Sequence, residues 1–340
     1  MNDDLKLLEA TAADIFTAYQ DRPGLWEELE EAGLTGIGIP EEAGGSGGDA
    51  EMAAVILRTA AYHAAEIPIA ETLWIAGPLL AAAGLPVPAG QLTAAESQDG
   101  GLVLERAGDD WILDGTLRRV PWARDAVRVA VVVDGRVCSV DPARATLVHG
   151  ANLAGEPRDD VSFHAVAVPA DQVAELPEGP SIQVRGALAR SIQLSGAAQR
   201  ALEHSLRYAG ERRQFGRPIA AFQAVQQYLA TLAGEVTILE LSTRSAVATL
   251  DDPRTELLAV VAAVRTNACR AASVVAELSH QVHGAIGTTH EHDLRRSTLR
   301  LWSWREEYGN ENQWAAALGL LSAAAEDPWH LITGPTTTRS

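Results

Sequence analysis

Four long segments rich in alanine, leucine and valine fill most of the C-terminal half of the chain. They are residues 186–210, 219–250, 254–283 and 311–325. Long helices joined by short connections pack as antiparallel neighbours. The segments therefore predict a four-helix bundle, with Pro253 at the first position of the third helix.

The first 85 residues also have a helical pattern. Apolar residues recur three and four positions apart among Glu and Asp, which is the spacing of amphipathic helices. Gly33 follows the second of these stretches and favours a helix end there. The expected helices are Asp3–Tyr19, Leu25–Ala32 and Ala50–Ala65.

The middle of the chain, from about residue 86 to 175, has the pattern of β-strands. Val127–Val133 and Arg136–Val140 flank Asp134-Gly135, which predicts a hairpin. Helices followed by strands and then by helices indicate an α+β fold and not a βαβ one. We expect an N-terminal helical domain at 1–85, a small β domain at 86–178, the four-helix bundle at 179–326 and an extended tail at 327–340.

Charge and cysteine content restrict the partners and the compartment. The net charge of −18 argues against nucleic acid and against an anionic membrane surface, although a few well-placed Arg residues suffice for a phosphorylated ligand. Cys138 and Cys269 are the only cysteines, which favours a reducing compartment. The N-terminus lacks a cationic signal region, and the longest apolar runs, 257–264 and 72–85, are short for a membrane span. We therefore expect a cytoplasmic protein.

Two glycine-rich stretches lack the context of a phosphate-binding loop. Gly33–Gly38 follows a helix, whereas a dinucleotide fingerprint follows a strand. Gly44–Gly48 is not followed by the Lys-Ser/Thr pair of a P-loop. Both stretches are therefore interpreted as turns.

The connection between the first two bundle helices concentrates arginine. Arg212, Arg213 and Arg217 lie within six residues, beside Gly, Phe and Gln. Guanidinium groups match phosphate oxygens with two hydrogen bonds at once. The next helix is expected to begin near Pro218 and to add backbone N–H donors. The connection is thus either a phosphate site or a solvated interhelical turn.

Residues 281–293 combine glycine with histidine. Gly284 and Gly287 favour a helix end and allow a ligand to approach the backbone closely. Glycines would interrupt the framework of a metal site, and no cysteine is near, so we expect no metal but capping and ligand contact. The histidines concerned are His280, His283, His290 and His292.

Two adjacent carboxylates, Glu306 and Glu307, precede Tyr308-Gly309 and could supply a general base. Neighbours in sequence do not face each other on a helix, so the two are not an acid–base pair. The alternative interpretation is a helix with Arg/Glu pairs and packed tryptophans.

Taken together, these segments resemble the acyl-CoA dehydrogenase family over nearly the whole chain. Two motifs are specific, and two others are weak alone. The specific motifs are Glu211–Ile219 followed by Phe222-Gln223 and Gln281–Gly287 followed by Glu291, and the weak ones are Gly38–Gly47 and Val161–Ala170.

The resemblance implies FAD as cofactor and oxidation of an acyl-CoA thioester at Cα–Cβ. In the family a Glu carboxylate removes the α-proton, the β-hydride goes to the flavin, and electron-transfer flavoprotein is the usual acceptor. In the family's dimer, the bundle of one subunit holds the ADP half of the FAD whose ring lies in the other subunit. The residues implied to contact that half here are Arg212, Gln214, Phe215, Gln223, Gln281, Gly284 and Ala285.

The chain departs from the family where the chemistry takes place. Tyr308 stands at the usual position of the base, and Gly186 at the position that some members use instead. Glycine carries no base, and a phenol with a pKa of about 10 is mostly protonated at neutral pH. Thr93–Gly101 lacks the Thr-Glu-Pro…Gly-Ser motif that grips flavin and substrate, and only Trp122 remains where the family places a Trp against the flavin.

We interpret the chain as a shortened companion subunit without a catalytic residue of its own. With its Trp-Ser-Trp-Arg ending at 302–305, it resembles the β-type subunits of actinobacterial α2β2 enzymes that act on bulky substrates such as steroid side-chain CoA thioesters. A homologous catalytic subunit would supply the base and the pockets for the flavin ring and the acyl group. The tryptophans near this ending would fit either a subunit interface or a core; they are Trp302, Trp304 and Trp314. Two alternatives remain: a self-sufficient homodimer with Glu307 as base, and a structural relative that binds no flavin.

Overall fold

The computed structural model describes residues 3–97, 100–250, 256–289 and 292–333. The chain forms two compact units, each built from two separate segments. The first unit is Met1–Ile56 with Glu66–Gly186, and the second is Leu57–Ala65 with Ala187–Ser340. The expected order of N-terminal helices, middle sheets and C-terminal helices is confirmed.

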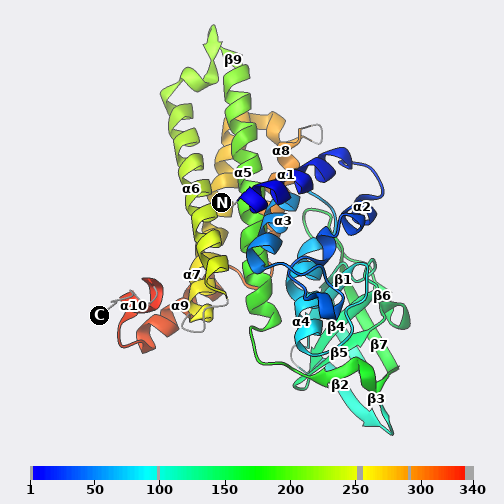
Figure 1. Ribbon diagram of the computed structural model, residues 1–340. Coiled ribbons are helices and arrows are strands. Elements are labelled where there is room, and N and C mark those ends of the chain that lie inside the picture. The colour runs from blue at the N-terminus through cyan, green and yellow to red at the C-terminus, as the bar shows by residue number, and fades with distance from the viewer. Residues whose placement is uncertain (1–2, 98–99, 251–255, 290–291, 334–340) are drawn as a thin grey trace. The chain divides into compact units, whose positions relative to one another are not determined.

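The helices of the first unit follow the predicted pattern closely. They are α1 (Asp3–Ala18), α2 (Leu25–Glu31), the first half of α3 (Ala50–Tyr62), a π-helix (Glu71–Ala76) and α4 (Gly77–Ala82) (Figure 1). The backbone of Gly33 has a φ of +71°, as the predicted helix end requires. Thr72 Oγ1 on the π-helix accepts from Leu92 N at 3.0 Å, which fixes the helix against the first strand.

Two four-stranded sheets complete the first unit. One has the order β1-β4-β5-β8 and the other β2-β3-β7-β6. The strands are β1 (Leu92–Glu96), β2 (Leu102–Ala107), β3 (Asp110–Pro121), β4 (Arg128–Val133), β5 (Arg136–Val140), β6 (Thr146–Val148), β7 (Arg158–Val168) and β8 (Val173–Glu175). Fully buried Leu113 and Phe163 of one sheet share a core with Val129 and Val131 of the other, so the sheets pack face to face.

The predicted hairpin is confirmed, and one strand pairing was not foreseen. β4 and β5 pair antiparallel around Asp134 and Gly135, whose φ values are +50° and +71°. Both residues adopt the left-handed conformation that a two-residue hairpin turn needs. β1 and β4 are parallel neighbours in one sheet, although β2 and β3, which lie between them in sequence, belong to the other sheet. No local sequence pattern predicts a pairing between such distant strands.

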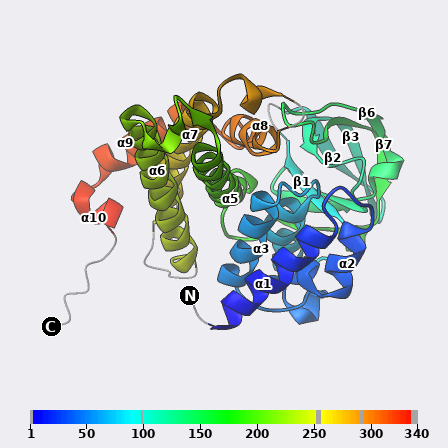
Figure 2. The same cartoon turned by 90° about the horizontal axis from the view of Figure 1, so that it is seen from above.

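The second unit is helical. Its elements are the second half of α3, α5 (Ile182–Glu211, with its first turn in the first unit), the short strands β9 (Arg213–Gln214) and β10 (Arg217–Pro218), α6 (Gln223–Ala248), α7 (Leu257–His283), α8 (Leu294–Trp304), α9 (Glu311–Ala324) and α10 (Pro328–Thr333). Figure 2 shows α5, α6 and α7 side by side. Small buried residues such as Ala198 on α5 and Ala272 on α7 let these helices approach closely around one core.

Two details of the predicted helices are wrong, and one lies outside the described residues. α6 begins at Gln223 and not near Pro218, because residues 213–218 form a β-hairpin instead. The tail is not extended throughout, since Asp327 accepts from Trp329 N at 2.9 Å and Pro328 starts α10. Pro253 lies outside the described residues.

Within the described part of the chain, one stretch is long and apolar enough to cross a membrane by length and composition. It is Leu257–Thr288, which contains α7. More than half of its most apolar window, 56%, is buried inside the protein, as in the central helix of a helical core. The stretch is longer than the apolar runs that the sequence alone indicated.

Candidate cofactor site and the position of the base

The arginine-rich connection folds into a small β-hairpin at the end of α5. Gln214 pairs with Arg217, and Phe215 and Gly216 form the tip with φ values of +49° and +80°. Ile219 N donates to Arg212 O at 2.8 Å and closes the base of the hairpin. The hairpin replaces the helix start expected near Pro218.

Aromatic contacts connect the hairpin to the start of α6. The Arg217 guanidinium lies 4.3 Å from the centre of the Phe222 ring, within the range of a cation–π contact. The rings of Phe215 and Phe222 meet edge to face at 6.1 Å. Phe222 thus packs against the hairpin through Arg217 and Phe215. The side chain of Phe215 itself is 90% exposed.

A small apolar cluster brings three distant segments to the same end of the second unit. Ala209 at the end of α5, Ile219 after the hairpin and Val282 at the end of α7 are buried against one another. Figure 1 shows the hairpin and the end of α7 at this end of the helices. The two specific motifs, whose residues Ile219 and Val282 are 63 positions apart in sequence, therefore lie side by side.

All seven residues implied to contact the ADP half of FAD lie on this end, and all are exposed. The conformation of Gly284, with φ +64° and ψ −150°, is one that essentially only glycine adopts. A Cβ added there would meet nothing within 4 Å, so the backbone is open to an approaching group. The seven residues are Arg212, Gln214, Phe215, Gln223, Gln281, Gly284 and Ala285.

The donors on this surface fit the diphosphate of the ADP half of FAD. Gln223 is the first residue of α6, whose N-terminus has no side-chain cap. An uncapped helix N-terminus leaves backbone N–H groups and a positive dipole for an anion. Exposed Arg212, Arg213 and Arg217 add guanidinium groups beside it. Together these groups have the charge and hydrogen-bonding character that a diphosphate requires.

Buried histidine rings pack beneath the surface at this end of the second unit. The ring of His283 stacks on Tyr208 at 4.5 Å and meets His292 edge to face at 4.8 Å. Burial, together with the positive charges of Arg200 and Arg207, lowers the pKa of His204 to about 4. Burial also lowers the pKa of His283. These two rings are therefore neutral at neutral pH.

The described residues contain no group of three or more His, Cys, Asp or Glu side chains arranged to hold a metal ion. His280 Nε2 and Thr298 Oγ1 lie 3.1 Å apart, and His283 Nδ1 lies 2.8 Å from Ser279 O. His290 and Glu291 lie outside the described residues.

Glu307, the residue before Tyr308, is paired with a buried arginine. Arg190 Nε lies 2.7 Å from Glu307 Oε2, and the two side chains are 2% and 14% exposed. The guanidinium thus engages the Oε2 atom of the Glu307 carboxylate in an ion pair inside the chain. The guanidinium carbon of Arg190 also lies 5.5 Å from the centre of the Tyr308 ring. Gly186 is buried one helical turn before Arg190 on α5.

A second buried arginine shapes the turn that carries these residues. Arg265 on α7 donates to the backbone oxygens of Trp304 and Glu307, both at 2.6 Å, and to Gly309 O at 3.2 Å. It thereby caps the end of α8, where Tyr308 and Gly309 have φ values of +52° and +90°.

The remaining residues of this segment have structural surroundings. Glu306 is 52% exposed and pairs with Arg305 at 2.8 Å. Trp304 and Trp314 are 2% and 4% exposed and belong to the core or its edge, so the interpretation of these two as interface residues is wrong. Trp302 also packs against the core.

The first unit contains Trp122 and the segment 93–101, where the resemblance implies the flavin-ring side of the site. Trp122 is 8% exposed and its backbone has a φ of +55°, while its N–H donates to Pro157 O at 3.2 Å. Of the segment 93–101, residues 98 and 99 lie outside the described residues. Thr93 is fully buried in β1.

Sequence reasoning missed Arg190 and Arg265. Both interrupt otherwise apolar helical stretches, Leu188-Ala189-Arg190 in α5 and Val264-Arg265 in α7. An arginine on the buried face of a helix needs partners, because an unpaired buried charge is costly. That pattern could have marked both positions, but it could not have named their partners.

Comparison with known proteins agrees with this architecture. The N-terminal domain model of acyl-CoA dehydrogenases matches residues 6–85, and the C-terminal domain model matches residues 184–312. The chain belongs to the acyl-CoA dehydrogenase family.

Individual relatives refine the comparison. Acyl-CoA dehydrogenase IpdE2 of Mycobacterium tuberculosis is 30% identical over 79% of this chain and 77% of its own length. The crystal structure of the ChsE4-ChsE5 complex from M. tuberculosis is similar in fold, with a TM-score of 0.85, 22% identity and coverage of 96% of this chain and 98% of the other. The structure of a variant of the Tcur3481-Tcur3483 steroid ACAD gives a TM-score of 0.83 at 26% identity, covering 94% of this chain and 98% of the other.

Proposed function

We propose that this chain is the companion subunit of a hetero-oligomeric, FAD-dependent acyl-CoA dehydrogenase. It contributes contacts to the ADP half of FAD, while a homologous subunit supplies the base and the pockets for flavin ring and acyl group. The observation that carries the proposal is the pairing of Glu307 with Arg190, beside a Tyr and a Gly at the family's base positions.

FAD, when bound, accepts a hydride from the β-carbon of an acyl-CoA while a base removes the α-proton. In this chain, the residues suited to holding the cofactor are those of the exposed end of the second unit. Arg212 and the N-terminus of α6 supply positive charge for the diphosphate, and the exposed ring of Phe215 supplies an apolar face. Gln281 and Gly284 offer an amide side chain and an open backbone.

The likeness to chains from two-component assemblies supports a heteromeric partner. One relative in fold is described as a complex of ChsE4 with ChsE5, and the other as a Tcur3481-Tcur3483 steroid ACAD. We propose an α2β2 assembly acting on a bulky acyl-CoA, such as a steroid side-chain CoA thioester, and passing electrons to electron-transfer flavoprotein.

The test is to purify the chain alone and after co-expression with the homologue encoded beside it. Alone, the chain should retain little FAD and should not oxidise acyl-CoA. Co-expressed, the complex should be yellow and should reduce a flavin acceptor with a steroid side-chain CoA thioester faster than with butyryl-CoA. Robust turnover by the isolated chain would refute the proposal, and a colourless, stable complex would favour the non-enzymatic alternative.

The self-sufficient alternative is tested by Glu307→Gln, with Glu306→Gln as matched control. Loss of a general base lowers the rate by about 10²–10⁴-fold. We expect the turnover of the active complex to change less than about threefold in either variant. Glu307→Gln should nevertheless lower Tm, because it removes the ion pair between Glu307 and the buried Arg190. A hundredfold loss of turnover confined to Glu307→Gln would identify Glu307 as the base.

A further inference from the structure

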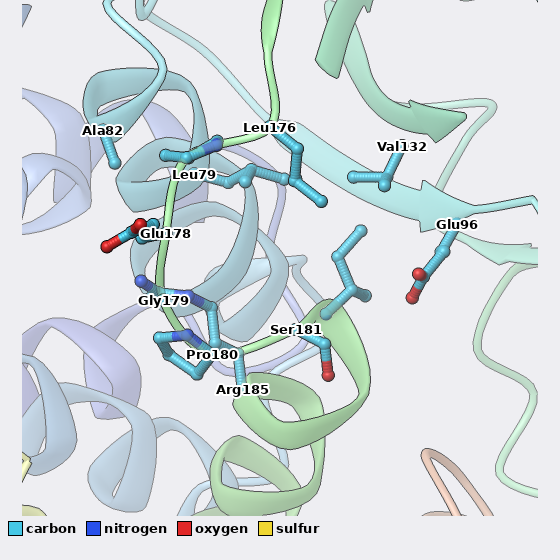
Figure 3. A pocket seen from close by; sticks show the side chains of 12 residues that line it. Leu79, Ala82, Glu96, Val132, Leu176, Glu178, Gly179, Pro180, Ser181 and Arg185 are labelled. Carbon is cyan, nitrogen blue, oxygen red and sulfur yellow. The ribbon is translucent and has the colours of Figure 1, made fainter. Parts of the chain in front are cut away.

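A small pocket of about 100 Å³ lies in the first unit, beside the segment that leads from β8 into α5 (Figure 3). Most of its wall is apolar, and three ionisable side chains also line it. The apolar residues include Leu79, Val132, Leu176, Pro180 and Ile182, and the ionisable ones are Glu96, Glu178 and Arg185.

Arg185 is the unusual member of this wall. Its Nε atom is buried and has no hydrogen-bond partner among the described residues. Its guanidinium forms no ion pair within the described part of the chain. The side chain as a whole is partly buried, and burial lowers its pKa, so its surroundings hold the cation at a cost.

The position of Arg185 in the helix adds to that cost. It lies in the first turn of α5, a 30-residue helix that has no acidic residue in that turn. The positive end of a helix dipole disfavours a cation and favours an anion. The guanidinium of Arg185 and the N-terminus of α5 therefore both favour an anionic ligand.

Size and rim charge restrict what that ligand is. A cavity of about 150 Å³ is large enough for a benzene ring, so 100 Å³ has room for roughly four or five non-hydrogen atoms. The exposed carboxylates Glu96 and Glu178 lie on opposite sides of the pocket in Figure 3. They repel a dianion more strongly than a monoanion.

We propose that this pocket binds a short aliphatic carboxylate of two or three carbon atoms. The guanidinium of Arg185 pairs with the carboxylate, and the chain of the acid lies against Leu79, Val132 and Ile182. A guanidinium matches a carboxylate with two hydrogen bonds, and the apolar wall suits the attached carbons. The site does not depend on flavin binding or on the partner subunit.

The test is thermal unfolding of the full chain with propionate, compared with chloride and with phosphate at equal ionic strength. We expect a saturable rise in Tm with propionate and no comparable rise with the other two anions. Saturation-transfer NMR on the methyl signal of propionate should detect the bound acid directly. A propionate effect no larger than that of chloride, or an equal effect of phosphate, would overturn the proposal.

Arg185→Met removes the partly buried cation and keeps an apolar side chain of similar length. Without propionate this variant should have a higher Tm than the natural chain, and propionate should no longer raise it. Arg144→Met changes the same charge at an exposed position and should keep the full response to propionate. If Arg185→Met responds to propionate as the natural chain does, the site is not at Arg185. If it folds poorly, loss of the propionate signal on adding excess acetate to the natural chain decides between a specific pocket and general salt effects.

Discussion

At the scale of single residues, buried arginines hold residues 304–309 in place. Arg190, Arg265 and Arg300 are the three largest side chains that are fully buried in the described structure. Arg190 holds the carboxylate of Glu307, and Arg265 holds the backbone on either side of it. Arg190 thus pairs with a carboxylate of this chain, and Arg265 donates to backbone oxygens of this chain.

Replacing Arg265 should destabilise the second unit much more than replacing an exposed arginine on the same helix. Arg265→Met leaves the oxygens of Trp304 and Glu307 without their donor, and a buried acceptor left unsatisfied costs about 1–3 kcal/mol. We expect a loss of about 2–4 kcal/mol in the free energy of unfolding. Arg270→Met is the control, because Arg270 pairs with Glu235 near the surface and should cost about 1 kcal/mol or less. Equal losses in urea unfolding would contradict this role of Arg265.

At the scale of elements, the second half of α3 is held against α5 by close contact and polar pairing. A Cβ added to Gly196 would lie 2.1 Å from the backbone oxygen of Arg58. Arg58 also donates to Gln199 Oε1 at 2.9 Å, and the hydroxyl of Tyr62 donates to Glu203. The absence of a side chain at Gly196 therefore allows the two helices to meet.

Gly196→Ala should destabilise the protein although alanine is the better helix former. The new methyl group meets a backbone oxygen that cannot move without shifting α3, and such overpacking costs about 1–3 kcal/mol. Gly210→Ala on the same helix meets nothing within 4 Å and should be neutral or stabilising by up to about 1 kcal/mol. Chemical unfolding of the two variants measures the contrast. A stabilising Gly196→Ala would show that the two helices are not in tight contact.

The hairpin at the end of α5 should matter for cofactor retention and not for stability. Phe215 is 90% exposed, so Phe215→Ala should change the free energy of unfolding by less than about 0.5 kcal/mol. In the assembled enzyme we expect FAD to dissociate at least tenfold more readily, because the ring is at the tip of the proposed ADP contact. Val148→Ala, at an exposed position of the other unit, is the control and should leave FAD binding unchanged. Normal FAD retention by Phe215→Ala would remove the hairpin from the proposed site.

Local features of both fold and site could be predicted from the sequence, and features that join distant residues could not. The helix α2 and the turn at Asp134-Gly135 follow from patterns within a few residues. The pair formed by Arg190 and Glu307 joins residues 117 positions apart, and neither side chain has a local pattern that names the other. The exposure of Gln281 and its closeness to the hairpin depend on the burial of Val282, which only the packed helices reveal.

At the scale of the whole molecule, buried neutral histidines make stability depend on pH. An unfolded histidine has a pKa of about 6.5, whereas that of His204 in the folded chain is about 4. Between these values the unfolded state binds the proton and the folded state does not, so acidification favours unfolding. The contribution of His204 is complete above pH 6.5 and is lost as the pH falls towards 4.

We expect Tm to fall steadily when the pH is lowered from 6.5 to 4 at constant ionic strength. His204→Gln should flatten part of this dependence, because glutamine takes up no proton in either state. His164→Gln, at an exposed position, should leave the pH dependence as it is in the natural chain. Differential scanning fluorimetry across this range measures both variants. Parallel pH profiles for His204→Gln and the natural chain would exclude His204 as a source of the effect.

The division of the second unit into Leu57–Ala65 and Ala187–Ser340 has a consequence for the order in which the chain folds. During synthesis, the short N-terminal piece leaves the ribosome more than 110 residues before the helix α5, against which it packs. The helical unit is therefore completed late, after the sheets between its two pieces have been made. A fragment cut at residue 187 would lack Arg58 and Tyr62, and the face of α5 around Gly196 would be exposed to solvent. Co-expression of such a fragment with residues 1–186 is the way to recover the unit from separate parts.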